Sequence, residues 1–304
     1  MFQISAHDDF VVYSIGNKDG SVQASFVPEL GGVMSSLICL GQDGPRELLY
    51  HNDFFWQRNN DDLAGGMPFL FPVCARLSRN NQLGVYSYNG QYYELPIHGF
   101  SWQLPWEVLE HSEGLLVMQL QFNESTLKQF PFDFAVTLEY QIEDQQLFCH
   151  QTYENKGGEA MPYYAGFHPY FLVEESKDQI KINYEPIERW QYNRSLTDLV
   201  GRLPVFDLPS TLSNADLNEQ LTRVADNKTV IMTYPNGDIL EVEAQGVENP
   251  DLFPFVQLYT KPGKPFFCIE PWMGYPNALN AMKGVRWLAA GQAERGLLRI
   301  SLGK

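Results

Sequence analysis

The stretch Phe134-Ala135-Val136-Thr137-Leu138-Glu139-Tyr140-Gln141-Ile142 alternates large apolar side chains with small or polar ones. Because successive side chains of a β-strand point to opposite faces of a sheet, this period of two predicts a strand with one buried face. The same alternation recurs at residues 116–122, 240–244 and 298–302. Strands are therefore expected both in the middle of the chain and at its C-terminal end.

Shorter runs rich in β-branched and aromatic residues occupy residues 10–15, 21–27, 147–153, 230–234, 255–260 and 266–270. Turn-forming sequences are expected to close hairpins at residues 17–20, 89–90, 155–158 and 235–238. No window shows three helical turns with an apolar stripe, and the polar residues 197–226 are expected to form a loop-like excursion. We predict an all-β protein, a large antiparallel β-sandwich with few short helices.

The composition suits a folded core, since 44% of the 304 residues are hydrophobic and 19% are charged. No low-complexity tract and no Ser/Gly-rich linker divides the chain. Antiparallel sandwiches and barrels often reach this length undivided. Residues 1–304 are therefore expected to form a single β-sandwich domain.

Charge and the absence of targeting patterns limit the partners. The 21 Lys and Arg residues against 37 Asp and Glu residues give a net charge of −16, which repels nucleic acid. Residues 1–9 lack the basic region and apolar run of a secretory signal, and no later stretch is long enough to span a bilayer. We expect a cytoplasmic monomer or homodimer without nucleic-acid or membrane partners.

Cysteine spacing and motif content argue against metal and cofactor chemistry. No CxxC pair exists, so reduced and mostly buried thiols are expected at Cys39, Cys74, Cys149 and Cys268. GxGxxG, GxxxxGK[ST], HExxH and GxSxG motifs are all missing from the sequence. No metal ion and no organic cofactor is predicted.

Two of the six histidines have restrictive neighbours. His168 lies in the aromatic run of residues 163–171, where the following Pro169 favours extended backbone at the histidine. His98 lies between Pro96 and Gly99. Each is a candidate for catalysis, with a satisfied core histidine as the alternative interpretation.

Two charged residues interrupt apolar runs. Glu270 ends the run of residues 266–269, where desolvation raises the pKa of a carboxyl group toward the range of a general base. Arg76 lies in the largely apolar residues 65–77 and needs a partner or a ligand. The alternative interpretation of Glu270 is a strand-end acid paired with an arginine. That of Arg76 is an internal ion pair, for which Glu270 itself is a candidate partner.

Five segments, taken in order, resemble the aldose 1-epimerase (galactose mutarotase-like) family. They are GGMP through AR at residues 65–76, PIHGF at 96–100, GFHPYF at 166–171, QLYT at 257–260 and CIEPW at 268–272. The resemblance spans most of the chain. It implies an antiparallel β-supersandwich that binds sugars in a cleft on one sheet.

The resemblance also implies catalytic roles. Glu270 matches the general base that takes the proton of the anomeric hydroxyl, and His168 matches the general acid that protonates the ring oxygen. The sugar ring then opens, the C1–C2 bond turns, and ring closure gives the other anomer.

Substrate-binding roles follow in the same way. His98 matches the second histidine, which helps polarise the ring oxygen, Arg76 matches the arginine that contacts hydroxyls, and Gln257 matches the glutamine of the QxYT-like stretch. Trp272 and Tyr164 are our own candidates for aromatic walls, since apolar sugar faces pack on aromatic rings.

Departures from the galactose-type pattern leave the substrate open. The sequences around Arg76 and His168 look closer to the less characterised bacterial branch and to hexose-6-phosphate mutarotase-like members. The family's substrate-binding aspartate falls near residues 216–220, where Asp216 and Glu219 are both candidates. We predict an aldohexose mutarotase. One alternative is a hexose-6-phosphate mutarotase, whose phosphate would meet cations from Arg76, Arg79 and Lys261 or Lys264. The others are a non-catalytic carbohydrate-binding protein and a β-sandwich without sugar function.

Overall fold

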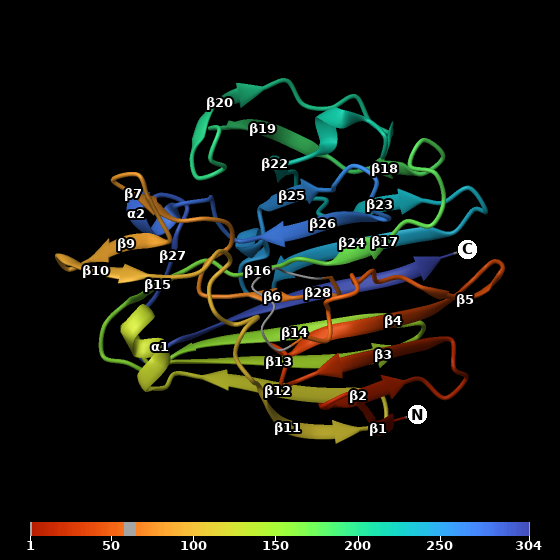
Figure 1. Cartoon of the computed structure of the whole chain (residues 1–304), viewed down its shortest axis with the longest axis horizontal. Helices are drawn as coiled ribbons and strands as arrows, with labels where there is room; N and C mark the ends of the chain where they lie inside the picture. Colours follow the sequence, from red (N-terminus) through yellow and green to blue (C-terminus); the bar gives the residue numbers. More distant parts are fainter. Residues whose placement is uncertain (1, 58–64, 304) are drawn as a thin grey trace.

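The computed structural model describes residues 2–57 and 65–303, and antiparallel strands dominate it (Figure 1). The expected domain span of 1–304 also includes residues 1, 58–64 and 304, which lie outside the described residues. Helical segments are short: α1 (Glu124–Gln129), α2 (Ala278–Ala281) and the 3-10 turns η1 (Ala215–Leu217) and η2 (Pro250–Leu252). The prediction of an all-β protein with few short helices is confirmed.

A nine-stranded sheet forms one layer of the molecule. Its order is β11 (Glu107–Ser112), β12 (Leu115–Gln121), β13 (Phe134–Glu143), β14 (Gln146–Asn155), β28 (Ala293–Gly303), β24 (Ile239–Gly246), β23 (Val230–Thr233), β18 (Lys181–Asn183) and β21 (Ser210–Thr211). Burial alternates along β13, where Leu138 and Tyr140 are buried and Thr137 and Glu139 are half-buried. The predicted period of two therefore marks the face that packs into the core.

An eight-stranded sheet carries the segments with chemical interest. Its order is β20 (Leu199–Leu203), β19 (Pro186–Tyr192), β22 (Gln220–Val224), β25 (Phe255–Tyr259), β26 (Phe266–Trp272), β16 (Gly166–Phe167) and β6 (Phe69–Leu70), with β17 (Tyr170–Leu172) also paired to β26. All seven residues of β26 are buried. A strand buried on both faces explains why its sequence is nearly continuous in apolar residues.

A five-stranded sheet extends the layer of the eight-stranded one. It consists of β1 (Phe2–His7), β2 (Phe10–Gly16), β3 (Val22–Val27), β4 (Val33–Gly41) and β5 (Gly44–Glu47). Isolated bridges join Met34 to Met67 and Leu49 to Phe171, so this sheet continues toward β6 and β17. Strands β2 and β4 pack on β11, β12 and β28, while β26 packs on β24. The two smaller sheets together therefore cover the nine-stranded one as a sandwich.

Short two-stranded ribbons complete the structure: β7 (Ser78–Arg79) with β8 (Gln82–Leu83), β9 (Val85–Tyr88) with β10 (Gln91–Glu94), and β15 (Met161–Tyr163) with β27 (Arg286–Leu288). Three predicted hairpins are confirmed, since the turns at residues 17–20, 89–90 and 235–238 join β2 to β3, β9 to β10 and β23 to β24. Among the described residues, no helix has the length and apolar character needed to cross a membrane.

Two local predictions are wrong. Residues 155–158 close no hairpin, because the side chain of Asn155 donates to the carbonyls of Glu159 and Leu288 and directs the chain to β15, which pairs with β27. Residues 197–226 are not merely a loop, because β20 and β22 lie on either side of β19 in the eight-stranded sheet. Within this segment β20 forms the edge of the sheet, whereas β22 lies inside it between β19 and β25.

Candidate active site

The strand register brings Glu270, His168 and Gln257 together on the eight-stranded sheet. Gly166 of β16 pairs with Trp272, and Tyr170 of β17 pairs with Cys268, so His168 lies in the break between β16 and β17 at the level of Glu270. On the other side of β26, Gln257 of β25 is the direct register partner of Glu270. Cross-strand neighbours share a face of the sheet, which is why segments far apart in sequence meet here.

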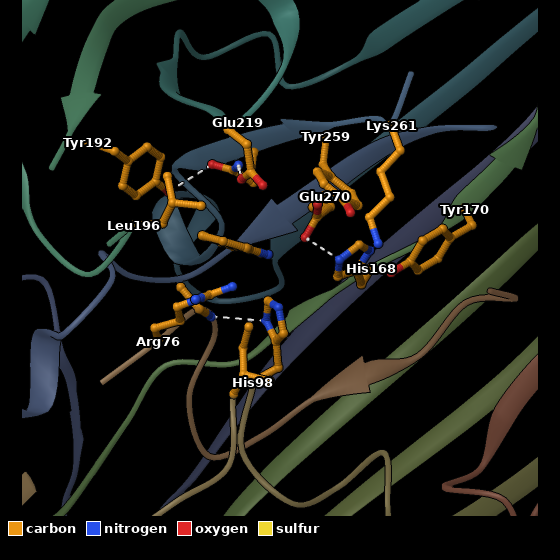
Figure 2. A pocket seen from close by; sticks show the side chains of 14 residues that line it. Arg76, His98, His168, Tyr170, Tyr192, Leu196, Glu219, Tyr259, Lys261 and Glu270 are labelled. Carbon is orange, nitrogen blue, oxygen red and sulfur yellow. Dashed lines mark hydrogen bonds and ion pairs between the residues drawn. The ribbon is translucent and has the colours of Figure 1, made fainter. Parts of the chain in front are cut away.

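These residues lie in a cavity of about 320 Å³, a volume within the range of small-molecule sites (Figure 2). The cavity is open to solvent on one side and has both polar and aromatic lining residues: Ala75, Arg76, Ile97, His98, His168, Tyr170, Tyr192, Leu196, Glu219, Gln257, Tyr259, Lys261, Glu270 and Trp272.

His168 and Glu270 form a buried pair, and their side chains point toward one another (Figure 2). The distance between Nε2 of His168 and Oε2 of Glu270 is 3.4 Å, and the residues are 5% and 1% exposed. Burial raises the pKa of Glu270 well above its usual range, and the Glu219 carboxylate adds to the rise, while the indole of Trp272 opposes it. Burial lowers the pKa of His168 well below its usual range, and His98 adds to that shift.

Both shifts favour the uncharged forms of the pair. A protonated carboxyl group facing a neutral imidazole can pass one proton across without changing the net charge of the cavity. The pair can thus supply one group that gives a proton and one that takes a proton, which is what acid–base chemistry on a neutral substrate requires.

His98 is held as a neutral hydrogen-bond donor. Its Nδ1 accepts a hydrogen bond from the backbone N–H of Ala75 at 3.0 Å, so in the neutral ring the proton is on Nε2. Burial lowers the pKa of His98 to about 3, and the Arg76 charge contributes. His98 therefore keeps one fixed donor in the cavity across the physiological pH range.

The backbone at His98 explains how a loop can hold this side chain so firmly. Ala75 and His98 both have left-handed backbones, with φ of 64° and 63°, and the N–H of His98 donates back to the carbonyl of Ala75 at 2.9 Å. A non-glycine residue in this region costs about 1 kcal/mol or more. The reciprocal hydrogen bonds offset that cost and join the two loops that carry His98 and Arg76.

Arg76 lies half-buried at the cavity wall. Within residues 2–57 and 65–303 it forms no ion pair, so the alternative interpretation of a pair with Glu270 is wrong. Its carbonyl accepts a hydrogen bond from the N–H of Asn277, whose side chain donates to Asp198. The guanidinium is therefore available to a ligand in the cavity.

Glu219 is the acidic residue of the 216–220 segment that reaches the cavity. Tyr192 donates to Oε1 of Gln257 at 2.8 Å, and Nε2 of Gln257 lies 3.5 Å from Oε2 of Glu219. Burial raises the pKa of Glu219, while the charges of Arg76 and Lys261 lower it. Asp216 instead has a 72% exposed side chain beside Arg189, which places it outside the cavity.

The two expected aromatic walls have different outcomes. Trp272 is 3% exposed and lines the cavity, with its ring centroid 5.9 Å from that of His98. Tyr164 is fully buried and does not line the cavity, because its ring packs against Gly274 in the core. The residue type alone suggested an aromatic wall, and it does not indicate the direction in which the side chain points.

Sequence reasoning missed several lining residues. Tyr170 stacks on His168 with ring centroids 4.5 Å apart and planes 3° apart, and Tyr259 approaches the same imidazole edge-on at 6.0 Å. Both residues lie inside the quoted motifs, Tyr170 two positions after His168 and Tyr259 two positions after Gln257, and this closeness to a candidate site residue was the available signal. Tyr192 and Leu196 come from a segment that carried no such signal.

The described residues thus form an antiparallel β-sandwich with a buried imidazole–carboxylate pair in a cavity that is open to solvent. The sequence model described as aldose 1-epimerase matches residues 12–287. The chain belongs to the aldose 1-epimerase family, as the resemblance of its five motifs implied.

Individual relatives are distant. The chromosomal protein LacX of Lactococcus lactis subsp. lactis is 25% identical over 247 residues, covering 75% of this chain and 80% of that protein. The Slr1438 protein from Synechocystis sp. PCC 6803 has a crystal structure with a TM-score of 0.83 and 26% identity over 100% of this chain and 99% of that one. A putative glucose-6-phosphate 1-epimerase of Salmonella typhimurium is 27% identical over 100 residues, 30% of each chain.

Proposed function

We propose that this protein is an aldose 1-epimerase that interconverts the α and β anomers of a free aldohexose. The observation that carries the proposal is the buried contact between Nε2 of His168 and Oε2 of Glu270, at 3.4 Å, on the floor of the cavity. A binding protein has no need of two ionisable groups whose pKa values are shifted in opposite directions by burial.

Ring opening uses the pair in its charge-separated form. Proton transfer from Glu270 to His168 gives a carboxylate and an imidazolium. The carboxylate takes the proton of the anomeric hydroxyl, the C1–O5 bond breaks, and the ring oxygen takes the proton of His168. The pair ends as carboxyl and imidazole, the uncharged form that burial favours.

Ring closure reverses these steps after rotation about C1–C2. The ring hydroxyl attacks C1 and returns its proton to His168, while Glu270 gives its proton to the carbonyl oxygen. Atoms and charges balance at both stages, and neither stage calls for a metal ion or an organic cofactor. We assign to the Nε2–H of His98 the hydrogen bond to the ring oxygen, because its Nδ1 already accepts from the N–H of Ala75.

Sugar hydroxyls need fixed donors and acceptors, and the cavity wall supplies both. Arg76 provides a guanidinium, and the linked side chains of Gln257 and Glu219 provide an amide and a carboxylate. Trp272 offers an aromatic surface for an apolar face of the ring. We assign these four residues to substrate binding.

The test is the rate at which freshly dissolved α-glucose and α-galactose reach anomeric equilibrium, followed by NMR with the uncatalysed rate subtracted. Wild-type protein should accelerate the exchange, and Glu270→Gln should lower kcat at least about 100-fold, since a general base contributes on this order. Glu159→Gln, at an exposed position, serves as the matched control and should retain wild-type rates.

A folded Glu270→Gln variant with wild-type kcat would refute the assigned role. Sugars that bind to wild-type protein without any accelerated exchange would favour a non-catalytic carbohydrate-binding protein.

A hexose 6-phosphate is the second candidate substrate, favoured by one observation. Lys261 is exposed and lines the cavity together with Arg76, so two cations could meet a phosphate. The carboxylate of Glu219 in the same cavity favours a neutral sugar instead. If the phosphate is the substrate, Lys261→Gln should raise KM for glucose 6-phosphate at least about tenfold and leave KM for glucose unchanged.

A further inference from the structure

A third side chain, that of Cys268, is fully buried beside the proton-transfer pair and does not itself line the cavity. Cys268 and Glu270 are two residues apart on β26 and so lie on the same face of the strand. His168 lies across from them, in the break between β16 and β17. One ligand atom from each of His168, Cys268 and Glu270 lies within 4.8 Å of the other two.

Two polar atoms of this cluster have no hydrogen-bond partner among the described residues: Nδ1 of His168 and Oε2 of Glu270. Both side chains are more than nine-tenths buried. Oε2 of Glu270 faces Nε2 of His168 at 3.4 Å without forming a hydrogen bond, and buried polar atoms are rarely left without partners in native proteins. This unsatisfied oxygen therefore marks the position for a ligand, whereas Nδ1, the other ring nitrogen of His168, is not part of it. Glu270 also lines the open cavity, which gives such a ligand a route of entry.

The distances suit a small tetrahedral cation. Ligand atoms about 2.0 Å from zinc are separated by about 3.3 Å in a tetrahedron, close to the 3.4 Å between Nε2 of His168 and Oε2 of Glu270. In such a site a thiolate sulfur lies about 3.5 Å from the other ligand atoms, so Cys268, at 4.8 Å or less, has to approach by about 1.3 Å at most through adjustment of the side chains. The cavity then provides the open fourth position.

The donor set selects the kind of metal. Imidazole, thiolate and carboxylate together suit Zn²⁺ and its analogues Co²⁺ and Cd²⁺, whereas Mg²⁺ and Ca²⁺ prefer oxygen donors alone. A cation at this place would engage the His168–Glu270 pair itself. The metal would therefore compete with proton transfer instead of assisting it.

We propose that His168, Cys268 and Glu270 form a site for a thiophilic divalent cation, Zn²⁺ above all, which excludes sugar from the cavity floor. The claim that the three residues bind the cation rests on this geometry alone. The inhibition part rests on the proposed function, because it requires the pair to be catalytic.

The experiment is a titration of the metal-free full chain with Co²⁺, followed by absorption spectroscopy. A thiolate-to-cobalt charge-transfer band and the d–d bands of tetrahedral cobalt are expected, and Zn²⁺ should displace both. Cys268→Ala should remove the charge-transfer band and weaken Zn²⁺ binding at least about tenfold. Cys149→Ala, at another fully buried cysteine in the nine-stranded sheet, is the matched control and should keep the band.

Two results would overturn the site: a wild-type cobalt complex without a thiolate band, or a band that survives in folded Cys268→Ala. Should circular dichroism show that Cys268→Ala does not fold, Glu270→Gln replaces it and should also weaken Zn²⁺ binding at least about tenfold. These readouts need no turnover, so failure of the proposed function would leave them unchanged. Where turnover is present, Zn²⁺ should inhibit it competitively with the sugar.

Discussion

At the scale of single residues, the two buried histidines of the cavity differ in the groups that they contact. His98 and His168 are both buried and neutral, yet only His98 has its Nδ1 fixed by a backbone N–H. His168 instead faces a carboxyl group with which it can exchange a proton. The first imidazole is therefore a fixed donor, and the second is free to change its protonation state.

Glu219 provides a test of this electrostatic arrangement. Its charge raises the pKa of Glu270, and loss of the shared proton from the pair should end activity at high pH. Glu219→Gln removes the charge, lowers the pKa of Glu270 and should move the alkaline limb of the kcat profile to lower pH.

The pH dependence of kcat for Asp216→Asn, the exposed neighbour, is the control and should match wild type. An alkaline limb that stays in place or moves upward in Glu219→Gln would show that Glu219 does not act on Glu270.

At the scale of elements, loops rather than strands aim His98 and Arg76. The backbone of Gly99 bridges that of Phe71, beside β6, and has a φ of 71°. A Cβ atom there would lie 2.2 Å from the carbonyl oxygen of Phe71. Only glycine permits this approach, which places the neighbouring His98 over the cavity.

Gly99→Ala should therefore lower the free energy of unfolding by about 3 kcal/mol or more and reduce mutarotation, because backbone contact adds to left-handed strain. Gly90→Ala is the matched control. Its φ of 78° is similar, but nothing lies within 4 Å of the added Cβ, so a loss of only about 1 kcal/mol is expected. Equal losses in chemical denaturation would show that the close approach is unimportant.

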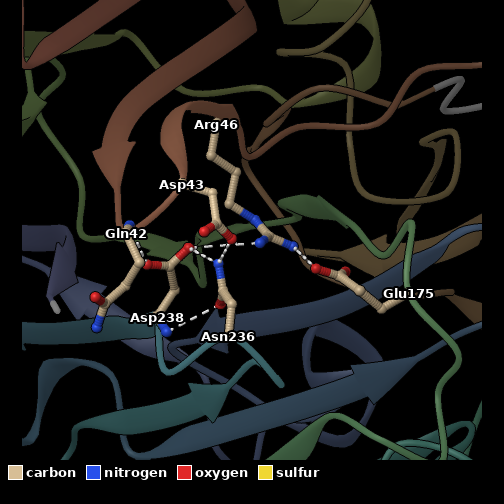
Figure 3. Close-up of polar contacts among 6 residues, drawn as sticks. All are labelled: Gln42, Asp43, Arg46, Glu175, Asn236 and Asp238. Atoms are coloured by element: carbon tan, nitrogen blue, oxygen red, sulfur yellow. Dashed lines mark hydrogen bonds and ion pairs between the residues drawn. The ribbon is translucent and has the colours of Figure 1, made fainter.

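A polar cluster of residues that do not line the cavity joins three connections of the sandwich (Figure 3). Arg46 of β5 lies 2.6 Å from Glu175 and 3.5 Å from Asp238, and its guanidinium stacks over Tyr234 at 3.7 Å. Asp238 is 1% exposed and also accepts from the backbone N–H of Gln42. The cluster thus ties the β4–β5 hairpin to the β23–β24 hairpin and to the segment after β17.

Arg46→Met should cost about 3 kcal/mol in the free energy of unfolding, because it leaves the buried carboxylate of Asp238 without its cation. Urea denaturation measures the change. Arg202→Met breaks a pair with Glu188 in which the arginine side chain is 65% exposed, so this control should change stability by less than about 0.5 kcal/mol. Similar small changes in both variants would mean that the cluster adds little.

At the scale of the whole molecule, one apolar core connects the layers. A single cluster of buried residues extends from Ile15 of β2 to Leu302 of β28 and includes Phe167, Leu221 and Ile269 of the eight-stranded sheet. We propose on this basis that the chain is one domain. A monomer or homodimer and a cytoplasmic location stay predictions from the sequence.

One domain should unfold as one unit. Scanning calorimetry should give a single transition whose calorimetric and van't Hoff enthalpies agree, with a total near 200 kcal/mol at about 0.7 kcal/mol per residue. Two resolved transitions would show that the buried cluster does not make the chain unfold as one cooperative domain.

Much of the architecture could be predicted from the sequence because strand periodicity is local. The alternation in residues 134–142 and the apolar run at 266–270 each correspond to a strand with the expected burial. Family resemblance extended this to Glu270, His168, His98, Arg76 and Gln257, and our own expectation of an aromatic wall added Trp272. All six residues line the cavity. The prediction of a hairpin at residues 155–158 is wrong because a turn sequence does not determine whether the strand after it pairs with the strand before it.

The sequence by itself determined the strand content, the buried thiols and the kinds of side chain available for acid–base chemistry. Only the tertiary structure decided that His168 lies level with Glu270, that Glu219 rather than Asp216 enters the cavity, and that Tyr164 does not. The physical reason is that alternation within one strand shows which of its residues share a face. The register between strands and the backbone of the loops decide which residues of other segments lie next to that face.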